Sequence, residues 1–157
     1  MAIVLPTVRV YPREPIVECK GDSITGCYGV VNPRGAILIS ISTPTQEGYP
    51  GHSRFPNYSL WEDSLKLKFD DWSGLGSTNY YSPFTKFQAV DTLAFILKHQ
   101  GKDFDIHCDA GVSRSAAVGK FIVDNLGSTL YSDKIQTPNK RVLEFLNEQY
   151  RRHLRTL

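Results

Sequence analysis

A short stretch in the second half of the chain combines residue types that suit chemistry on an anion. Cys108 ends a short apolar segment, Phe104 to Cys108, that is predicted to be a strand. Arg114 stands where a helix is predicted to begin, five residues further on. A loop of this length can turn its backbone N–H groups toward one point, and a helix N-terminus and a guanidinium add to the same positive field. This field favours the thiolate of Cys108, which is the nucleophilic form. The spacing therefore predicts phosphoryl transfer to sulfur.

The residues around this cysteine resemble a known signature. His107, Cys108, Gly111, Arg114 and Ser115 match the pattern H-C-x-x-G-x-x-R-[ST] of the cysteine-dependent protein tyrosine phosphatases. The run 111–115 is most similar to their dual-specificity branch and its compact bacterial and phage relatives. The resemblance covers about the central third of the chain. It implies hydrolysis of phosphotyrosine, with phosphoserine and phosphothreonine as further candidates, through a phosphocysteine intermediate and without a metal or organic cofactor.

Each residue of this stretch has an expected role. Arg114 is expected to hold two phosphate oxygens with its planar fork, which lysine could not do. Ser115 either donates its hydroxyl to the Cys108 sulfur or is a plain helix N-cap. His107 points to the other face of its strand, so it is expected to orient the loop rather than to move a proton. The phosphate-binding loop consists of Asp109, Ala110, Gly111, Val112, Ser113 and Arg114, and the Asp109 side chain is expected to face solvent.

Breaking a phosphate ester also needs a proton donor for the leaving oxygen. In the family this donor is an aspartate on a loop after a neighbouring strand. Asp70 and Asp71 follow the predicted strand 64–69. Alternation along that strand places Asp70 on the solvent face with the lysines, and leaves Asp71 free to turn over the edge where open α/β sheets bind ligands. We therefore predict Asp71 as the general acid, with Asp70 and then Asp63 as alternatives.

Two rival functions remain open at this stage. In the first, the reaction is the same but the substrate is a phosphoinositide or an RNA 5′-triphosphate. The loop 109–113 contains no lysine, so it lacks the extra positive charge that favours such polyanions. The second rival is a module that binds phosphoproteins without turnover. The presence of both Cys108 and Arg114 argues against it. The four histidines do not fall at metal-ligand spacing. A disulfide from Cys108 to Cys19 or Cys27 is not expected.

Composition narrows the class of protein. The chain has 157 residues, of which 41% are hydrophobic and 22% charged, and a formal net charge of +2. We expect a single domain over residues 1–157, and a charge this small gives no reason to expect nucleic acid. No apolar run reaches the roughly 20 residues that cross a bilayer, and no signal peptide is evident. Three cysteines favour a reducing, cytoplasmic location. The expected partners are phosphorylated proteins or peptides, and anions such as phosphate and vanadate.

The pattern of apolar residues predicts strands alternating with helices. Residues 2–10, interrupted by Pro6, suggest an edge strand or an arm over the sheet, and residues 36–41 a central strand covered on both faces. The remaining elements are predicted as a short strand at 16–19, a helix at 24–31, a loop at 45–57, a helix from Ser82-Pro83 to Gly101, a helix at 113–125 and a helix from Thr137-Pro138 onward. Phe84, Phe87, Val90, Leu93, Ala94 and Leu97 are the expected buried face of the helix after Pro83, and Val142, Phe145, Leu146 and Leu154 that of the last helix.

This order of elements predicts the fold class. Alternating strands and helices indicate an α/β sandwich, a single domain with a mostly parallel central sheet of about four to five strands flanked by helices. That architecture is also the one that the resemblance to protein tyrosine phosphatases implies.

Overall fold

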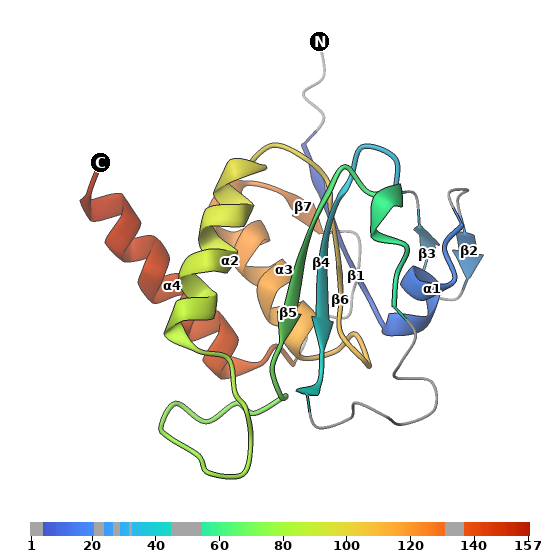
Figure 1. The fold of residues 1–157 in the computed structure, drawn as a ribbon. Coiled ribbons are helices and arrows are strands. Elements are labelled where there is room, and N and C mark those ends of the chain that lie inside the picture. Colours follow the sequence, from blue (N-terminus) through green and yellow to red (C-terminus); the bar gives the residue numbers. More distant parts are fainter. Residues whose placement is uncertain (1–4, 21–23, 27–28, 32, 45–54, 131–136) are drawn as a thin grey trace.

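The structure is a computed structural model that describes residues 5–20, 24–26, 29–31, 33–44, 55–130 and 137–157. Five strands form one parallel sheet in the order β5-β4-β6-β1-β7 (Figure 1). Its strands are β1 (Thr7–Tyr11), β4 (Ile37–Ser42), β5 (Asp63–Lys68), β6 (Phe104–His107) and β7 (Thr129–Leu130). The predicted α/β class with a parallel central sheet is confirmed.

The strands β4 and β6 lie at the centre of the sheet. All residues from Ile37 to Ile41 are buried, which explains why this strand reads as a continuous apolar run. Because the strands are parallel and in register, their C-terminal ends meet at one edge: His107 of β6 pairs with Ser40 of β4 and with Tyr11 of β1. The loops that follow β1, β4, β5 and β6 therefore begin at the same edge.

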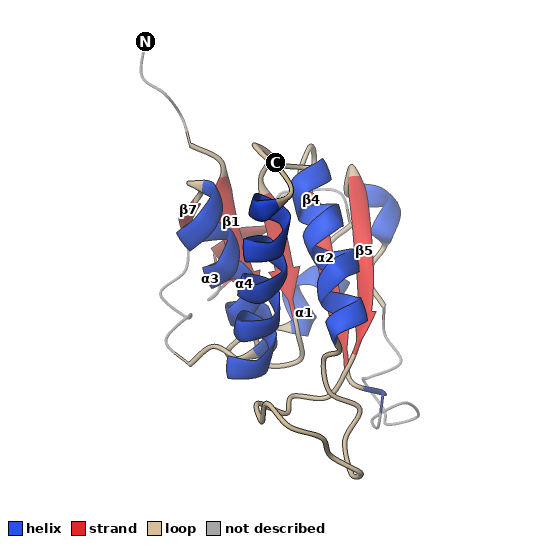
Figure 2. Ribbon diagram, turned by 90° about the vertical axis from the view of Figure 1, so that its left-hand side faces the viewer, coloured by secondary structure: helices blue, strands red, loops and turns tan. Residues whose placement is uncertain are grey.

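Three helices cover one face of the sheet (Figure 2). They are α2 (Lys86–Lys98), α3 (Arg114–Leu126) and α4 (Lys140–Arg155). Alternate residues of the strands, such as Val8, Ile39 and Ile106, pack with Phe121 and Leu146 into the main core. None of the helices in the described ranges is long and apolar enough to cross a membrane.

The other face of the sheet carries a smaller second core. It is covered by α1 (Arg13–Val17) and by a 3₁₀ turn at Tyr58–Leu60. A separate antiparallel pair, β2 (Ile24–Gly26) and β3 (Gly29–Val31), lies beside α1 (Figure 1). The second core consists of Tyr11, Ile16, Cys19, Ala36, Leu38 and Trp61. Both faces of the sheet are thus buried, as a parallel sheet requires.

The N-terminal region differs from the sequence-based predictions in three places. The first strand is not an edge strand, because β1 lies between β6 and β7 and Pro6, which has no N–H to donate, stays just outside the ladder. Residues 13–17 form a helix where a strand was expected at 16–19; Pro15 is tolerated there because the first-turn N–H groups need no helical partner. The helix expected at 24–31 is replaced by β2 and β3, as suits the β-branched pair Val30-Val31.

The second helix begins later than predicted, and only part of its predicted buried face is buried, with Leu93 in the core and Leu97 packed against it. Its N-cap is Thr85, which forms a capping box with Gln88, so Ser82 and Pro83 precede the helix. Phe87 and Val90 are exposed, whereas Ala89, Thr92, Leu93 and Ile96 face the core. In α4, Leu154 is likewise exposed although Val142, Phe145 and Leu146 are buried. Most of the loop expected at 45–57 lies outside the described residues.

Candidate active site

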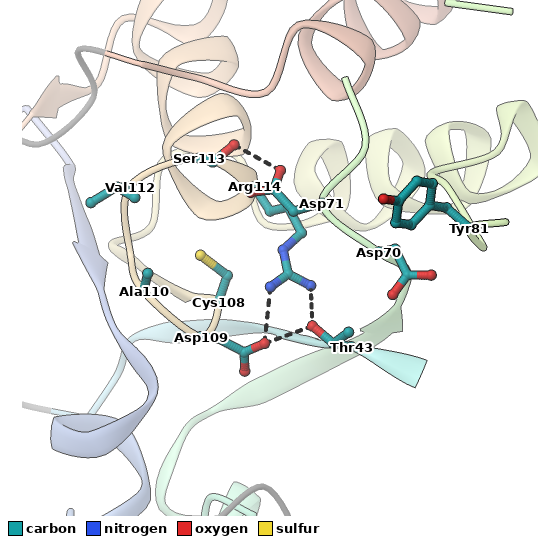
Figure 3. Close-up of a pocket in the computed structure, with 10 residues that line it drawn as sticks. All are labelled: Thr43, Asp70, Asp71, Tyr81, Cys108, Asp109, Ala110, Val112, Ser113 and Arg114. Atoms are coloured by element: carbon teal, nitrogen blue, oxygen red, sulfur yellow. Dashed lines mark hydrogen bonds and ion pairs between the residues drawn. The ribbon is translucent and has the colours of Figure 1, made fainter. Parts of the chain in front are cut away.

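The predicted phosphate-binding loop lies at the edge where the parallel strands end (Figure 3). β6 ends at His107, residues 108–113 form the turn, and α3 begins at Arg114. The chain therefore makes the strand, loop and helix that the spacing of Cys108 and Arg114 predicts. The N-terminus of α3 consequently lies directly after the loop that carries Cys108, and a helix N-terminus favours a bound anion.

Cys108 is almost fully buried at the base of this loop. Its Sγ lies 3.0 Å from the Oγ of Ser115 and accepts a hydrogen bond from the N–H of Gly111 at 3.2 Å. Both partners are donors toward a sulfur that carries negative charge, so they stabilise a thiolate. Ser115 thus contacts the sulfur, one of the two roles expected for it, while the N-cap position of α3 is taken by Ser113.

Gly111 allows the loop to close tightly against the end of β1. Its φ is +73°, a conformation that disfavours side chains. A Cβ at this position would lie 2.5 Å from the backbone nitrogen of Pro12. The neighbouring contact, in which the N–H of Arg13 donates to the carbonyl of Asp109 at 3.2 Å, fixes the same junction. Any side chain at 111 would therefore displace the loop.

Arg114 points its guanidinium into the cavity beside Cys108 (Figure 3). Nη1 donates to the Oγ1 of Thr43 and the carbonyl of Phe69, and Nη2 donates to Asp109. Nε is buried and has no hydrogen-bond partner among the described residues. A buried donor without a partner is costly, and a cation in the first turn of a helix opposes the helix dipole. Both costs would be offset by a bound anion.

Asp109 does not face solvent as the sequence suggested. Its carboxylate accepts hydrogen bonds from Arg13 at 3.0 Å, from Arg114 at 3.0 Å and from Thr43 at 2.6 Å. Partial burial alone would raise the pKa of Asp109, but the hydrogen bonds from Thr43 and Arg114 and the charge of Arg114 hold the pKa below its usual value. The expectation failed because Arg13, which recruits this carboxylate, is far away in the sequence. Asp109 thereby orients Arg114.

Asp71 is brought to the cavity by the loop after β5. Its Oδ1 accepts hydrogen bonds from the hydroxyl of Ser113 at 2.8 Å and from the Nδ2 of Asn139 at 2.7 Å. Asn139 is buried and is also the N-cap of α4, where its Oδ1 accepts from the N–H of Val142. Its own N–H donates to the carbonyl of Ser113. The carboxyl of Asp71 is therefore fixed on the mouth of the loop before any substrate binds.

The alternative carboxylates have other environments. Asp70 was expected on the solvent face, but only 4% of its surface is exposed, because the chain turns inward after Phe69. Its Oδ2 accepts from the N–H of Ser82 and its own N–H donates to the carbonyl of Ser82, so it closes the loop from within. Asp63 begins β5 and pairs with His99 at the opposite end of that strand.

His107 is fully buried on the face of the sheet opposite α2, α3 and α4. Its Nε2 lies 2.6 Å from the Oγ of Ser40 and its Nδ1 lies 3.3 Å from the carbonyl oxygen of Cys108. Burial lowers the pKa of His107 to about 4, so the ring is neutral near pH 7. These contacts orient the backbone at Cys108 and leave the ring away from the cavity.

The cavity above Cys108 has a volume of about 300 Å³. Besides the loop it is lined by Thr43, Asp70, Asp71 and Tyr81, and lysine is absent from the described residues that line it. Figure 3 shows Asp71 beside Ser113 and Arg114, with Cys108 on one side of Arg114 and with Asp70 and Tyr81 on the other. A single phosphate group fits such a space. The nucleophile, the cation and a carboxyl group thus converge on one small site.

Sequence reasoning missed three residues that complete the site. Thr43 was taken only as a strand end, although the parallel order of β4 and β6 puts it at the same edge as Cys108. Asn139 follows Pro138 as a helix cap, and nothing local signals its contact with Asp71. Arg13 belongs to no recognisable sequence motif. Cys19 lies in the second core, across the sheet from Cys108, and both are free thiols; Cys27 lies outside the described residues.

Three solved structures are similar to this chain. The human tyrosine phosphatase-like serine/threonine/tyrosine-interacting protein is 22% identical over 76% of this chain and 78% of that chain, with a TM-score of 0.48. PTPMT1 in complex with PI(5)P is 17% identical over 76% and 81%, with a TM-score of 0.43. Tk-PTP in its active form is 18% identical over 74% and 80%, with a TM-score of 0.41. These neighbours are tyrosine phosphatase-like proteins.

No protein-family model matches the sequence, and no curated protein gives a significant match. The structural likeness concerns the course of the chain at low identity. What the site can do chemically therefore depends on the sulfur, the guanidinium and the carboxyl group around the cavity.

Proposed function

We propose that the protein is a cysteine-dependent phosphatase that hydrolyses phosphate monoesters through a phosphocysteine. One observation carries the proposal. Cys108 and Arg114 line the same small cavity, and the Nε of Arg114 is buried without a hydrogen-bond partner among the described residues. This arrangement offers a nucleophile and a ready anion site together, which is what transfer of a phosphoryl group requires.

In the first step the Sγ of Cys108 attacks phosphorus and the bond from phosphorus to the ester oxygen breaks. Arg114 and the N–H groups of the loop hold the non-bridging oxygens as the geometry at phosphorus changes. Asp71 gives its proton to the leaving oxygen, so the alcohol or phenol departs neutral. Its two hydrogen bonds go to Oδ1, which leaves Oδ2 to carry the proton.

In the second step water attacks the phosphocysteine. Asp71, now a carboxylate, takes a proton from the water, the phosphorus–sulfur bond breaks and inorganic phosphate leaves. The sulfur departs as a thiolate, stabilised by the hydroxyl of Ser115 and the N–H of Gly111. The two steps together consume one water as the only other reactant and involve no change of oxidation state.

The proposed substrates are phosphotyrosine residues in proteins or peptides, with phosphoserine and phosphothreonine as secondary candidates. Two features of the cavity wall support this class over polyphosphorylated ligands. Asp70 and Asp71 put carboxylates at the wall, and the described lining offers no lysine to a polyanion. The exposed ring of Tyr81 provides an aromatic surface at the rim. Since the reaction uses a free thiol, we propose a reducing compartment such as the cytoplasm.

The test is hydrolysis of para-nitrophenyl phosphate in the presence of a chelator, followed by a panel of phosphotyrosine, phosphoserine, phosphoinositide and 5′-phosphorylated RNA substrates. We expect phosphate release without metal and the highest kcat/KM on phosphotyrosine peptides. Cys108→Ser is the control: its hydroxyl stays protonated, so turnover is lost while vanadate still binds. Binding of phosphopeptides by the wild-type chain without any turnover would instead identify a binding module.

A further inference from the structure

The loop between β5 and α2, residues 70–85 and called here the acid loop, contains no helix or strand. It carries Asp71 at its start. A loop of this length without secondary structure leaves many backbone carbonyls without regular partners, and such loops are usually mobile unless other groups bind them. Figure 2 shows the acid loop extending beyond the end of the sheet, near the beginning of α4. The residues that hold this loop therefore decide where Asp71 lies.

One side chain from α4 binds the acid loop at three points. The Nε of Arg141 donates to the carbonyl of Phe84 at 2.6 Å, and its Nη1 donates to the carbonyls of Gly74 at 2.9 Å and Gly76 at 2.7 Å. The guanidinium also lies over two aromatic rings, 5.3 Å from that of Trp72 and 4.6 Å from that of Phe145. Arg141 thus joins the middle and the end of the loop to the helix.

The position of Arg141 in its helix would be unfavourable without these contacts. It is the second residue of α4, where a cation opposes the helix dipole. Its residue surface is only 9% exposed, so solvent does not compensate for that cost. The cost is instead offset by the three carbonyl acceptors and by the two aromatic ring faces. Lysine could not donate along two edges of a planar group, so the geometry requires arginine.

The same turn of α4 also holds the start of the acid loop. Asn139, two residues before Arg141, donates to Asp71 and binds Ser113 of the phosphate-binding loop. Within the loop, the Trp72 ring lies against Gly74 so closely that a Cβ there would be 2.5 Å from the ring. The start, middle and end of the loop are therefore bound to one rigid helix end that also contacts the phosphate-binding loop.

We propose that Arg141 is a positioning residue for the general acid, and that it keeps Asp71 over the cavity before substrate binds. The proposal rests on the proposed function, because it assigns Arg141 a part in that reaction through Asp71. Arg141 itself does not line the cavity. Its removal should therefore weaken proton donation and leave attack by the sulfur largely intact.

The first experiment compares Arg141→Met and Arg141→Lys with Lys140→Ala, an exposed neighbour on the same turn. Substrates are phenyl phosphate, whose leaving group needs a proton, and 2,4-dinitrophenyl phosphate, whose leaving group does not. For both Arg141 variants we expect kcat/KM on phenyl phosphate to fall by about 10- to 100-fold and to change little on the dinitrophenyl ester. Lys140→Ala should match wild type. An equal fall on both esters indicates a merely structural role and overturns the proposal.

The second experiment places Arg141→Met in an Asp71→Asn background. If Arg141 acts through Asp71, the double variant should be no slower on phenyl phosphate than Asp71→Asn alone. If the double variant lost as much kcat/KM relative to Asp71→Asn as Arg141→Met loses relative to wild type, the proposal would be overturned.

Hydrogen exchange gives a readout that does not depend on turnover. Backbone amides of 72–84 should exchange faster in Arg141→Met than in wild type, with α3 unchanged. Unchanged exchange in 72–84 would contradict the proposal even for an active enzyme. If the wild-type chain hydrolysed no phosphate ester, the proposed function would fail, and exchange would still decide whether Arg141 holds the loop.

Discussion

The Sγ of Cys108 and the Oγ of Ser115 lie 3.0 Å apart, both buried between the end of β6 and the first turn of α3. This distance is normal for a hydrogen bond that involves sulfur. Ser115 therefore contacts the atom that must leave when a phosphocysteine is hydrolysed. The contact assigns Ser115 to the second half of the proposed reaction, because a leaving thiolate is stabilised by a donor in place.

Ser115→Ala should slow the second step more than the first. A hydrogen bond to a charged group is worth about 1.5–3 kcal/mol, which corresponds to roughly 10- to 100-fold in rate. With para-nitrophenyl phosphate the variant should release nitrophenol in a burst followed by a slow steady phase, as rapid-mixing absorbance would record. Steady-state turnover equal to wild type, without a burst, would remove Ser115 from this role.

Arg114→Lys should lose kcat/KM by about 10²–10³-fold, which is the usual cost of losing a donor to the transition state. The lysine ammonium keeps the charge but lacks the planar edge along which Nε and a second nitrogen of Arg114 can donate together. Arg152→Lys, on the exposed part of α4 where Arg152 pairs with Glu148, is the matched control and should behave as wild type. Steady-state kinetics of both variants measure the effect, and near-normal values for Arg114→Lys would refute the clamp.

Asp71→Asn and Asp70→Asn should differ in how rate depends on the leaving group. Asp71→Asn should slow aryl phosphates with poor leaving groups by about 10²–10⁴-fold and good ones far less. Asp70 is buried and accepts from the N–H of Ser82, a contact that an asparagine oxygen can keep, so Asp70→Asn should slow the poor leaving groups much less than Asp71→Asn does. The measurement is kcat/KM over a graded series of aryl phosphates. A steeper dependence for Asp70→Asn would transfer the acid role to Asp70.

Two buried groups near the site should give opposite dependences of stability on pH. Burial raises the pKa of Asp105 to about 6, so the folded state binds its proton more tightly than the unfolded chain. Its contribution is fully present below about pH 4 and is lost as pH rises through about 6. Burial lowers the pKa of His107 to about 4, so its contribution is present above about pH 6.5 and is lost as pH falls toward 4.

The two dependences should nearly cancel between about pH 4 and 6 in the wild-type chain. In Asp105→Asn only the pH dependence due to His107 should remain. The free energy of unfolding should then fall as pH is lowered through this range, by up to ~1.4 kcal/mol per pH unit. His107→Gln should show the reverse slope. Urea unfolding at several pH values measures both. Parallel pH profiles for wild type and Asp105→Asn would show that Asp105 does not titrate as proposed.

Local signals in the sequence predicted the centre of the fold well. The continuous apolar run at 36–41 and the spacing from Cys108 to Arg114 each report on a few adjacent residues, and the structure has a central strand and a strand–loop–helix there. The expected helix at 24–31 and the expected strand at 16–19 were wrong, because short segments with mixed propensities are decided by tertiary contacts.

Contacts between distant segments were beyond the sequence. The ion pair from Arg13 to Asp109 joins residues 96 positions apart, and the bond from Asn139 to Asp71 joins residues 68 apart. Alternation along β5 was extended to Asp70 although the strand ends at Lys68, and the chain there turns inward. A period of two holds only while the ladder continues, so carboxylates beyond a strand end cannot be placed by it.

The most direct test of the central claim is capture of the covalent intermediate. The chain is mixed with para-nitrophenyl phosphate and a chelator, quenched in acid within the first turnovers, and the peptide containing Cys108 is analysed by mass spectrometry. We predict one added phosphoryl group on Cys108, more abundant in Ser115→Ala than in wild type and absent from Cys108→Ser. Steady hydrolysis by Cys108→Ser at the wild-type rate, with no phosphoryl group on the wild-type cysteine, would contradict the account.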